Sequence, residues 1–246
     1  MIRSLFVIAL LGFALALAEE TQPEAETENA GEEDVFEGDI KIPKDFKGSD
    51  RNMVTDQTKR WPKVGGTVQV PYTFQSGVDS ATKNMALQAM KDYERRTCIR
   101  WVPRSSQRDY VEIFIGNGCY AYPGKIGGKQ PLSLGRGCAT QKGTPIHEMM
   151  HTMGFMHEQS RSDRDKYITL NRQNMMSGTE RQFDICTSCT LPNMGYDYGS
   201  VMHYGATAFS KNYQPTIVAK QRGVTLGQRT GFSDKDVAKL KQMYNC

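Results

Sequence analysis

The chain of 246 residues is long enough for one or two domains. It is 38% hydrophobic and 24% charged, which excludes both a membrane bundle and a disordered polyelectrolyte. The formal net charge of +4 is unevenly distributed. Residues 19–39 hold ten acidic and no basic residues, whereas residues 52–246 carry 26 Lys and Arg against 15 Asp and Glu, a net charge of +11. The basic residues are scattered and do not cluster with aromatic residues, so we expect no nucleic-acid partner.

The first 18 residues have the pattern of a secretory signal peptide. Arg3 supplies the positive charge, residues 5–17 form the apolar stretch, and Ala16-Leu17-Ala18 is a small-x-small cleavage site. A membrane anchor is the alternative, but a span needs about 20 apolar residues and this run is shorter. We therefore expect residues 1–18 to be removed, and the protein to be secreted and extracellular without a membrane attachment.

Residues 19–51 precede the predicted folded body. Between residue 19 and about residue 35 there is almost no large apolar side chain, so this part cannot bury enough surface to order itself. Apolar residues return between Val35 and Phe46, and this short piece is predicted to dock on the rest of the protein. The polar and basic residues 49–52 form a plausible site of proteolytic processing.

The body from residue 52 onward is predicted to mix helices and strands. Alternating residues predict strands near 67–72, 99–102 and 110–115. Helices are predicted from Asp79 or Ser80 to about Thr97, over about 144–153, and after residue 233, where Ser233 and Asp236 form a capping box. Residues 132–134 are predicted to form an edge strand, because Pro131 disfavours a central one. A long polar stretch without periodicity follows the 144–153 helix.

The segment from His147 to Glu158 carries the most specific pattern. His147 and His151 are four residues apart, so a helix places both imidazoles on one face, where they can hold one zinc ion. Gly154 permits a left-handed turn that returns His157 as a third nitrogen ligand. Three protein ligands leave one position open, which is typical of a catalytic zinc. A lone helical His is usually structural, but this combination in one fixed pattern is rare by chance.

Glu148 lies beside the first predicted ligand and can reach a water in the open position. We expect it to act as the general base that accepts the proton of this water and delivers it to a departing amine. Zinc would lower the pKa of the water towards about 7 and polarise a carbonyl group. Peptide-bond hydrolysis suits this chemistry well.

A second cluster follows at residues 200–205. A Met placed as Met202 suggests the turn beneath the zinc in the metzincin class, although Met also fills gaps in ordinary cores. Tyr204 can coordinate the metal or hydrogen-bond an oxyanion. The alternative interpretation is that Tyr204 is an ordinary buried aromatic residue whose hydroxyl bonds a backbone group. His203 is interpreted as structural, because no further ligand is required.

These residues resemble the astacin family of zinc metalloproteases. The family pattern HExxHxxGFxHExxR is present from His147 to Arg161, and SxMHYG is present from Ser200 to Gly205. The resemblance covers about residues 35–246. It implies zinc ligation by His147, His151 and His157, one zinc ion per subunit, Glu148 as the general base, and Tyr204 as a fifth ligand that moves away during the reaction.

The resemblance also implies a latent precursor. Phe36-Glu37-Gly38-Asp39 is similar to the FxGD segment of astacin prodomains, in which the Asp carboxylate occupies the open position of the metal. Asp39 is therefore expected to block the site, with Phe36 as an anchor. An activating protease would cut after Arg51 and leave a chain that starts at Asn52. Lys59-Arg60 is a competing site.

Three further assignments concern the processed chain. The new N-terminus is expected near Glu158, and a local ion pair of Glu158 with Arg161 or Arg164 is the alternative. The resemblance implies the disulfides Cys98–Cys246 and Cys119–Cys138. Cys186 and Cys189 depart from the basic family pattern; a redox motif is conceivable, but a local disulfide suits a polar loop of a secreted protein better.

The implied fold class is α+β, a metzincin fold of two subdomains with a twisted mixed sheet, a metal-binding helix and an irregular C-terminal half. The expected domains are a signal peptide at 1–18, a prodomain at 19–51 and a catalytic domain at 52–246. Protein or peptide substrates would lie extended in the cleft and pair with the edge strand near residues 132–134. We expect a monomer. Two alternative functions remain. The protein could be a secreted, non-enzymatic binding protein that keeps a metalloprotease scaffold, or a zinc hydrolase that acts on something other than protein.

Overall fold

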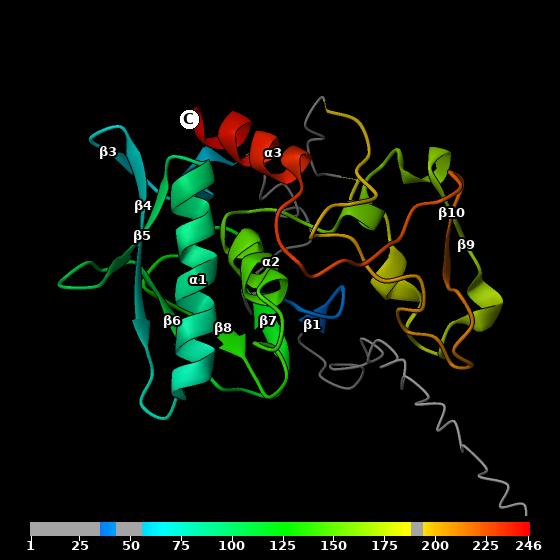
Figure 1. Ribbon diagram of the computed structural model, residues 1–246, viewed down its shortest axis with the longest axis horizontal. Coiled ribbons are helices and arrows are strands. Elements are labelled where there is room, and N and C mark those ends of the chain that lie inside the picture. Colours follow the sequence, from blue (N-terminus) through cyan, green and yellow to red (C-terminus); the bar gives the residue numbers. More distant parts are fainter. Residues whose placement is uncertain (1–34, 43–55, 188–193) are drawn as a thin grey trace, which may run out of the picture.

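The computed structural model describes residues 35–42, 56–187 and 194–246. These residues form two halves, with a short hairpin of the acidic leader between them (Figure 1). Each half has its own cluster of buried apolar side chains, so the predicted division into two subdomains is confirmed. The predicted signal peptide, the processing site at Arg51 and Asn52, and Cys189 lie outside the described residues.

One mixed sheet of eight strands joins the leader hairpin to the N-terminal half. Its strands are β1 (Val35–Phe36), β2 (Ile40–Lys41), β3 (Lys63–Val64), β4 (Thr67–Phe74), β5 (Ile99–Pro103), β6 (Tyr110–Phe114), β7 (Cys119–Ala121) and β8 (Lys129–Leu134). The spatial order is β1-β2-β7-β8-β6-β4-β3, and β5 also pairs with β4. β4 runs parallel to β5 and β6, and β6 runs parallel to β8, whereas β7 is antiparallel to β8.

Three α-helices accompany the sheet: α1 (Ser80–Arg96), α2 (Gly143–Thr152) and α3 (Asp234–Tyr244). Asp79 caps α1, because its carboxylate accepts the backbone N–H of Thr82 at 2.9 Å. Ala86, Met90 and Tyr93 lie on the buried face of α1, as their spacing predicts. All three helices predicted from the sequence are therefore present, each within about a turn of its expected bounds.

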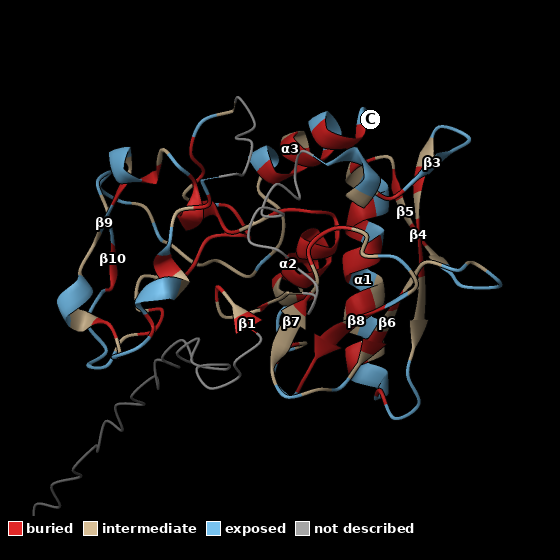
Figure 2. Ribbon diagram, turned by 180° about the vertical axis from the view of Figure 1, so that it is seen from behind, coloured by how far each residue is buried: buried red, intermediate tan, exposed pale blue. Residues whose placement is uncertain are grey.

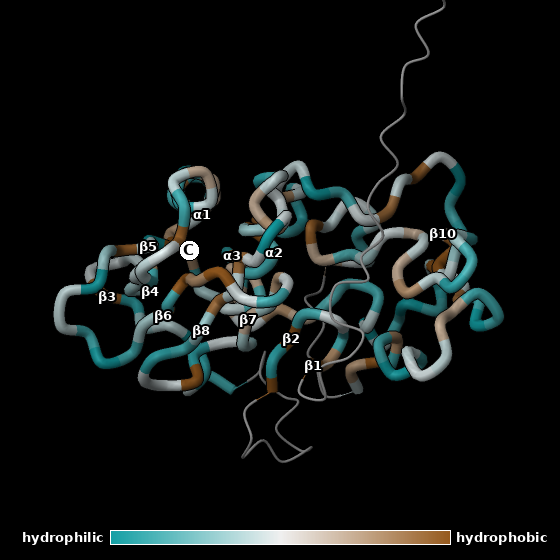
Figure 3. Tube along the Cα trace, turned by 90° about the horizontal axis from the view of Figure 1, so that it is seen from below, coloured by the Kyte–Doolittle hydropathy of each residue, from teal (hydrophilic) through white to brown (hydrophobic). Residues whose placement is uncertain are grey.

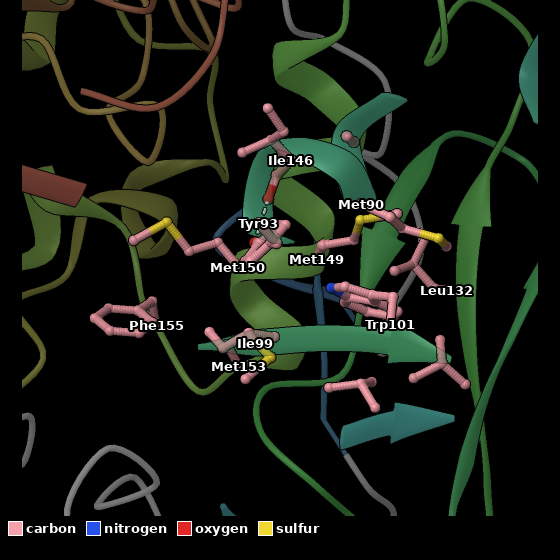
Figure 4. Close-up of a cluster of buried hydrophobic side chains, with 14 of the residues drawn as sticks. Met90, Tyr93, Ile99, Trp101, Leu132, Ile146, Met149, Met150, Met153 and Phe155 are labelled. Atoms are coloured by element: carbon pink, nitrogen blue, oxygen red, sulfur yellow. Dashed lines mark hydrogen bonds between the residues drawn. The ribbon is translucent and has the colours of Figure 1, made fainter. Parts of the chain in front are cut away.

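The central core surrounds α2, the helix that carries the predicted metal ligands. Every residue of α2 except Thr144 is buried, and Figure 2 shows this helix in the interior. Met149, Met150 and Ile146 pack with side chains of α1 and β5 (Figure 4), and the Tyr93 hydroxyl donates to the Ile146 carbonyl oxygen at 3.0 Å. Because α2 is enclosed on all sides, its polar side chains are held in fixed positions between the two halves.

The C-terminal half is largely irregular, as expected. Its regular elements are short: η3 (Glu158–Ser160), η4 (Arg164–Lys166), η5 (Arg172–Asn174), η6 (Glu180–Phe183), β9 (Ile168–Leu170) and β10 (Ile217–Ala219). A further short helix, η2 (Gln57–Lys59), lies at the start of the N-terminal half. Among the described helices, none combines the length and the apolar character needed to cross a membrane.

The last helix, α3, returns to the N-terminal half. Leu240 and Met243 join the core around α2. The predicted capping box is confirmed: Ser233 and Asp236 bond each other's backbone N–H groups. The buried Asp236 carboxylate also accepts the Ser200 hydroxyl at 2.6 Å and the Val201 N–H at 2.9 Å. The start of α3 thereby fixes the turn that carries Met202.

The prediction of an edge strand at residues 132–134 is wrong. β8 is an inner strand, and the outer strand of the sheet in the N-terminal half is β7, which β2 of the leader covers through the pair Ile40–Ala121. Figure 3 shows β1 and β2 between β7 and the C-terminal half. The Gly135 N–H donates to the Gly118 carbonyl oxygen on the β7 side. Backbone nitrogens of every second residue of a strand point the same way, so the nitrogen of Pro131 also faces the β7 side. The β7 pairing ends at Leu132, so Pro131 removes no ladder hydrogen bond.

Candidate metal centre

α2 places two histidines on one face, one turn apart. The Nε2 atoms of His147 and His151 lie 3.1 Å apart, and both rings are buried. The spacing of four residues produces this approach because successive turns of a helix stack side chains above one another.

The third histidine reaches the same point through a turn at Gly154. This residue has φ = 97°, a value that glycine adopts without a steric penalty. Its N–H donates to the His151 carbonyl oxygen at 2.7 Å, which ends the helix. The chain then returns and places the Nε2 atom of His157 3.3 Å from that of His147.

All three rings use their Nδ1 atoms for a second contact. Nδ1 of His147 bonds the Val201 carbonyl oxygen and Nδ1 of His151 bonds the Phe155 carbonyl oxygen, each at 2.7 Å. Nδ1 of His157 bonds the Glu37 carboxylate, also at 2.7 Å. Each partner is an acceptor, so each Nδ1 carries a proton, and in the neutral form of each ring Nε2 presents the lone pair that a metal needs.

Asp39 of the leader completes the cluster. Its carboxylate oxygens lie 2.9 Å from Nε2 of His147, 3.3 Å from Nε2 of His151 and 3.1 Å from Nε2 of His157. The buried Oδ1 atom of Asp39 has no hydrogen-bond donor. Four potential ligand groups gathered this closely require positive charge between them, from a proton or a metal ion, and three nitrogens with one carboxylate suit zinc.

The ionisation of the cluster favours a bound cation. Burial, with a contribution from Arg229, lowers the pKa of His147 to about 3, which keeps this ring neutral as a ligand must be. Burial acts against the charged form of His157 too, but Asp39 and Glu37 outweigh it and raise the pKa of His157 to about 9. The two carboxylates thus favour positive charge at this point, and zinc would have to displace the proton on Nε2 of His157. The three imidazoles hold the pKa of Asp39 well below its usual range despite its burial.

A comparison with protein-family models identifies the family of this chain. The model described as Astacin, a peptidase family, matches residues 53–245. This chain belongs to the astacin family. The histidine triad is of the type that binds zinc in astacins, so zinc is the cofactor, as the resemblance implied.

Individual relatives agree with this assignment. Zinc metalloproteinase nas-13 of Caenorhabditis elegans is 45% identical over 202 residues, which cover 81% of this chain and 44% of that protein. Meprin A subunit beta of Rattus norvegicus is 40% identical over 218 residues, 87% of this chain and 30% of that protein. The chain thus spans less than half the length of either relative.

The fold is also astacin-like. High choriolytic enzyme 1, a hatching enzyme zinc-protease from Oryzias latipes, aligns with a TM-score of 0.74 at 36% identity. The alignment covers 78% of this chain and 96% of that structure. Both observations support the α+β fold class expected from the sequence.

The remaining predicted residues of the astacin site lie around the triad. Glu148 is buried beside His147 on α2. The Tyr204 ring lies 4.6 Å from that of His157, and its hydroxyl donates to the Glu37 carbonyl oxygen. The buried Met202 lies in the turn whose Val201 oxygen binds His147. His203 bonds the Tyr196 hydroxyl at 2.7 Å and the Tyr204 oxygen at 2.8 Å, which suits a structural role.

Gly38 explains why the leader can approach so closely. Its φ is 78°, and a Cβ atom at this position would lie 2.8 Å from Cζ of Phe209, well inside contact distance. Its N–H donates to Oε1 of Gln182 at 2.9 Å. Because of the close approach to Phe209, a side chain at residue 38 would push Asp39 out of the centre.

Phe36, the expected anchor of the leader, is only half-buried, whereas Ile40 is fully buried.

Glu158 forms the local ion pair with Arg161 that was the alternative to the N-terminal role, and it also pairs with Lys239, which was not expected. Its Oε2 atom accepts the Nζ of Lys239 at 2.6 Å, its Oε1 atom accepts the Asp197 N–H at 2.8 Å, and Nε of Arg161 lies 3.7 Å away. Arg164 instead donates to the carbonyl oxygens of Gln159 and Phe183. Burial raises the pKa of Glu158, and Lys239 counters that shift. Sequence reasoning missed Lys239, although Asp236, Lys239 and Leu240 share the buried side of α3.

The structure contains both disulfides that the resemblance implied. Cys98–Cys246 joins the end of α1 to the last residue, and Cys119–Cys138 joins β7 to the segment after β8. Cys186 is also disulfide-bonded. Its expected partner, Cys189, lies outside the described residues, so this pairing stays a prediction.

The buried pair of Lys239 and Glu158 generates a stability prediction. Lys239→Met leaves the Glu158 carboxylate buried without its nearest cation, so we expect the free energy of unfolding to fall by about 3–5 kcal/mol. Denaturant unfolding of the purified precursor measures this loss. Lys241→Met, at an exposed position of the same helix, is the matched control and should change stability by less than about 0.5 kcal/mol. Equal losses in the two variants would contradict the prediction.

Proposed function

We propose that this protein is a secreted zinc endopeptidase that is synthesised as a latent precursor. The observation that carries the proposal is the meeting of three imidazole Nε2 atoms with the Asp39 carboxylate of the leader. The triad supplies a zinc site of the astacin type, and the carboxylate fills the position that a water needs for hydrolysis. The proposed signal peptide is 1–18, the prodomain 19–51 and the catalytic domain 52–246.

Bound zinc supplies a Lewis acid that polarises the scissile carbonyl group and lowers the pKa of a water towards about 7. Glu148 accepts the proton of the attacking water and then delivers it to the departing amine. Tyr204 donates a hydrogen bond from its hydroxyl group to the oxyanion that develops on the substrate, and it keeps its proton. In the precursor this hydroxyl is directed to the Glu37 carbonyl oxygen, which supports its availability as a donor once the leader has gone.

Substrates are proposed to bind along β7, at the edge that the leader covers in the precursor. The Ala121 N–H of β7 donates to the Asp39 carbonyl oxygen at 3.0 Å. Departure of residues 35–41 would leave this edge without its partner strand, and an extended peptide could replace it. Because such pairing recognises the backbone, the substrate class is broad: proteins or peptides with an accessible extended segment.

The packing around residue 60 favours activation after Arg51 over activation after Arg60. Nη1 of Arg60 donates to the Met243 carbonyl oxygen at 2.9 Å, and the buried Trp61 donates its Nε1–H to the Thr152 oxygen at 3.0 Å. A protease would need to detach these contacts before cutting after Arg60. We therefore expect the processed chain to start at Asn52.

After activation, the new N-terminal ammonium group of Asn52 is proposed to bind near Glu158, but Glu158 already has a cationic partner. Lys239 already neutralises this buried carboxylate. The ammonium group of Asn52 would have to share Glu158 with Lys239, so its approach would adjust an existing ion pair. It would not fill an empty site.

Activity of the processed chain is the main test. Purified 52–246 loaded with zinc should cleave casein, whereas Glu148→Gln should lower the turnover number at least about 100-fold, because the general base is lost. Zinc content measured by atomic absorption should be equal in the two proteins. Glu180→Gln, an exposed position, is the control and should retain activity. An inactive processed chain, indistinguishable from Glu148→Gln, would refute the proposed function.

Latency is tested in the uncut precursor. An Arg51→Gln background keeps the leader attached, and Asp39→Ala then removes the carboxylate from the zinc. We expect this precursor to gain activity against a short fluorogenic peptide, because water can enter the open position. Adding Glu148→Gln should abolish the gain. If Asp39→Ala remains as inactive as its parent, Asp39 is not the blocking group.

The oxyanion role of Tyr204 predicts a selective loss. Tyr204→Phe in the processed enzyme should lower the turnover number by about 100- to 1,000-fold while zinc stays bound. Tyr198→Phe is the matched control, because its hydroxyl donates to the Tyr167 carbonyl oxygen outside the triad. Loss of zinc from Tyr204→Phe would assign the hydroxyl to metal retention instead.

A further inference from the structure

The three zinc-binding imidazoles differ in what holds their outer nitrogens. His147 and His151 donate to the backbone oxygens of Val201 and Phe155, both within the catalytic domain. His157 instead donates to the carboxylate of Glu37, which belongs to the leader. Two ligands therefore keep their outer contacts after activation, and the third loses its contact together with the leader.

Glu37 is held in this position at an evident structural cost. Its φ of 48° lies in the left-handed region, which non-glycine residues rarely adopt. The side chain is fully buried, and its Oε1 atom has no hydrogen-bond partner. Strained and incompletely satisfied residues of this kind cluster at functional positions. The Phe36-Glu37-Gly38-Asp39 turn thus holds a second carboxylate in the interior beside the one that faces the metal.

The place of Glu37 determines what its carboxylate can do. It is not among the four groups that converge on the metal position, so it acts through the ring of His157. A carboxylate that accepts the Nδ1–H of a ligating histidine fixes the ring orientation and makes its Nε2 a stronger donor. A backbone carbonyl gives the same orientation with less charge, so His157 receives the strongest support of the three ligands.

We propose that Glu37 is a positioning residue that strengthens zinc binding through His157 in the precursor, so that the leader both blocks the site and retains the metal. The inference rests on the proposed latent precursor, and it goes further because it gives the leader a second role. Departure of the leader removes the ligand Asp39 and also weakens the ligand His157. The processed enzyme therefore holds zinc less tightly than the precursor does.

The test measures zinc, and it needs no catalytic activity. The zinc-loaded, full-length precursor in the Arg51→Gln background is mixed with an excess of a chromogenic chelator, and the half-time of zinc release is recorded. Glu37→Ala should release zinc about 10- to 100-fold faster than its parent. Glu37→Gln, which keeps a hydrogen-bond acceptor but no charge, should fall between them. Lys41→Ala, in the same leader hairpin with its amino group over the Tyr120 ring, is the control and should behave as the parent does.

Latency is recorded on the same samples with a fluorogenic peptide. Faster zinc release from a precursor that stays latent supports the proposal, because Asp39 then still occupies the site. Unchanged release in both Glu37 variants would overturn it. Faster release together with lost latency would also overturn it, because the whole leader would then have left. The half-times of zinc release do not depend on whether the processed chain cleaves casein, so the comparison of Glu37→Ala with its parent and with Lys41→Ala can fail or succeed independently of the proposed function. Only the latency readout requires an active enzyme.

Discussion

The structure depends on three imidazole nitrogens that share one point in space. The Nε2 atoms of His151 and His157 lie 3.1 and 3.3 Å from that of His147, distances at which their lone pairs repel unless a cation lies between them. Two of the ligands belong to α2, and the third stands at the entrance to the irregular C-terminal half. A zinc ion held by these ligands would tie that half to the rigid core, so we expect it to stabilise the fold as well as to supply the chemistry.

The leader hairpin complements this arrangement on both sides. β2 extends the sheet of the N-terminal half through β7, while Gly38 contacts Gln182 and Phe209 of the C-terminal half. One short segment thus touches both halves and the metal position together. Backbone hydrogen bonds, the carboxylates of Glu37 and Asp39, and the buried Ile40 all contribute to its contacts, so docking does not depend on a long apolar sequence.

The features that could be predicted from the sequence are those set by residues close together in the chain. The ligands of α2, the turn at Gly154 and the capping box at Ser233 follow from spacings of a few residues, so they were predictable. The position of β8 was not, because the hydrogen-bonding side of Pro131 depends on where β7 ends. The pairing of Lys239 with Glu158 was missed because it joins residues 81 positions apart. The contact of Glu37 with His157 joins residues 120 positions apart, and no local pattern in the sequence pointed to it.

The ion pair of Glu158 and Lys239 bears on the kinetics of activation. Because this pair already exists with the leader in place, the buried Glu158 carboxylate has a counterion before the proposed cut after Arg51. Cleavage then mainly changes how the leader is connected. Under the proposed latency, the tethered hairpin would compete with substrate at a high effective concentration, set by the length of the chain that joins it to the catalytic domain. Once cut, it becomes an ordinary diffusible peptide whose occupancy falls on dilution, so the onset of activity should follow its dissociation more closely than the cut itself.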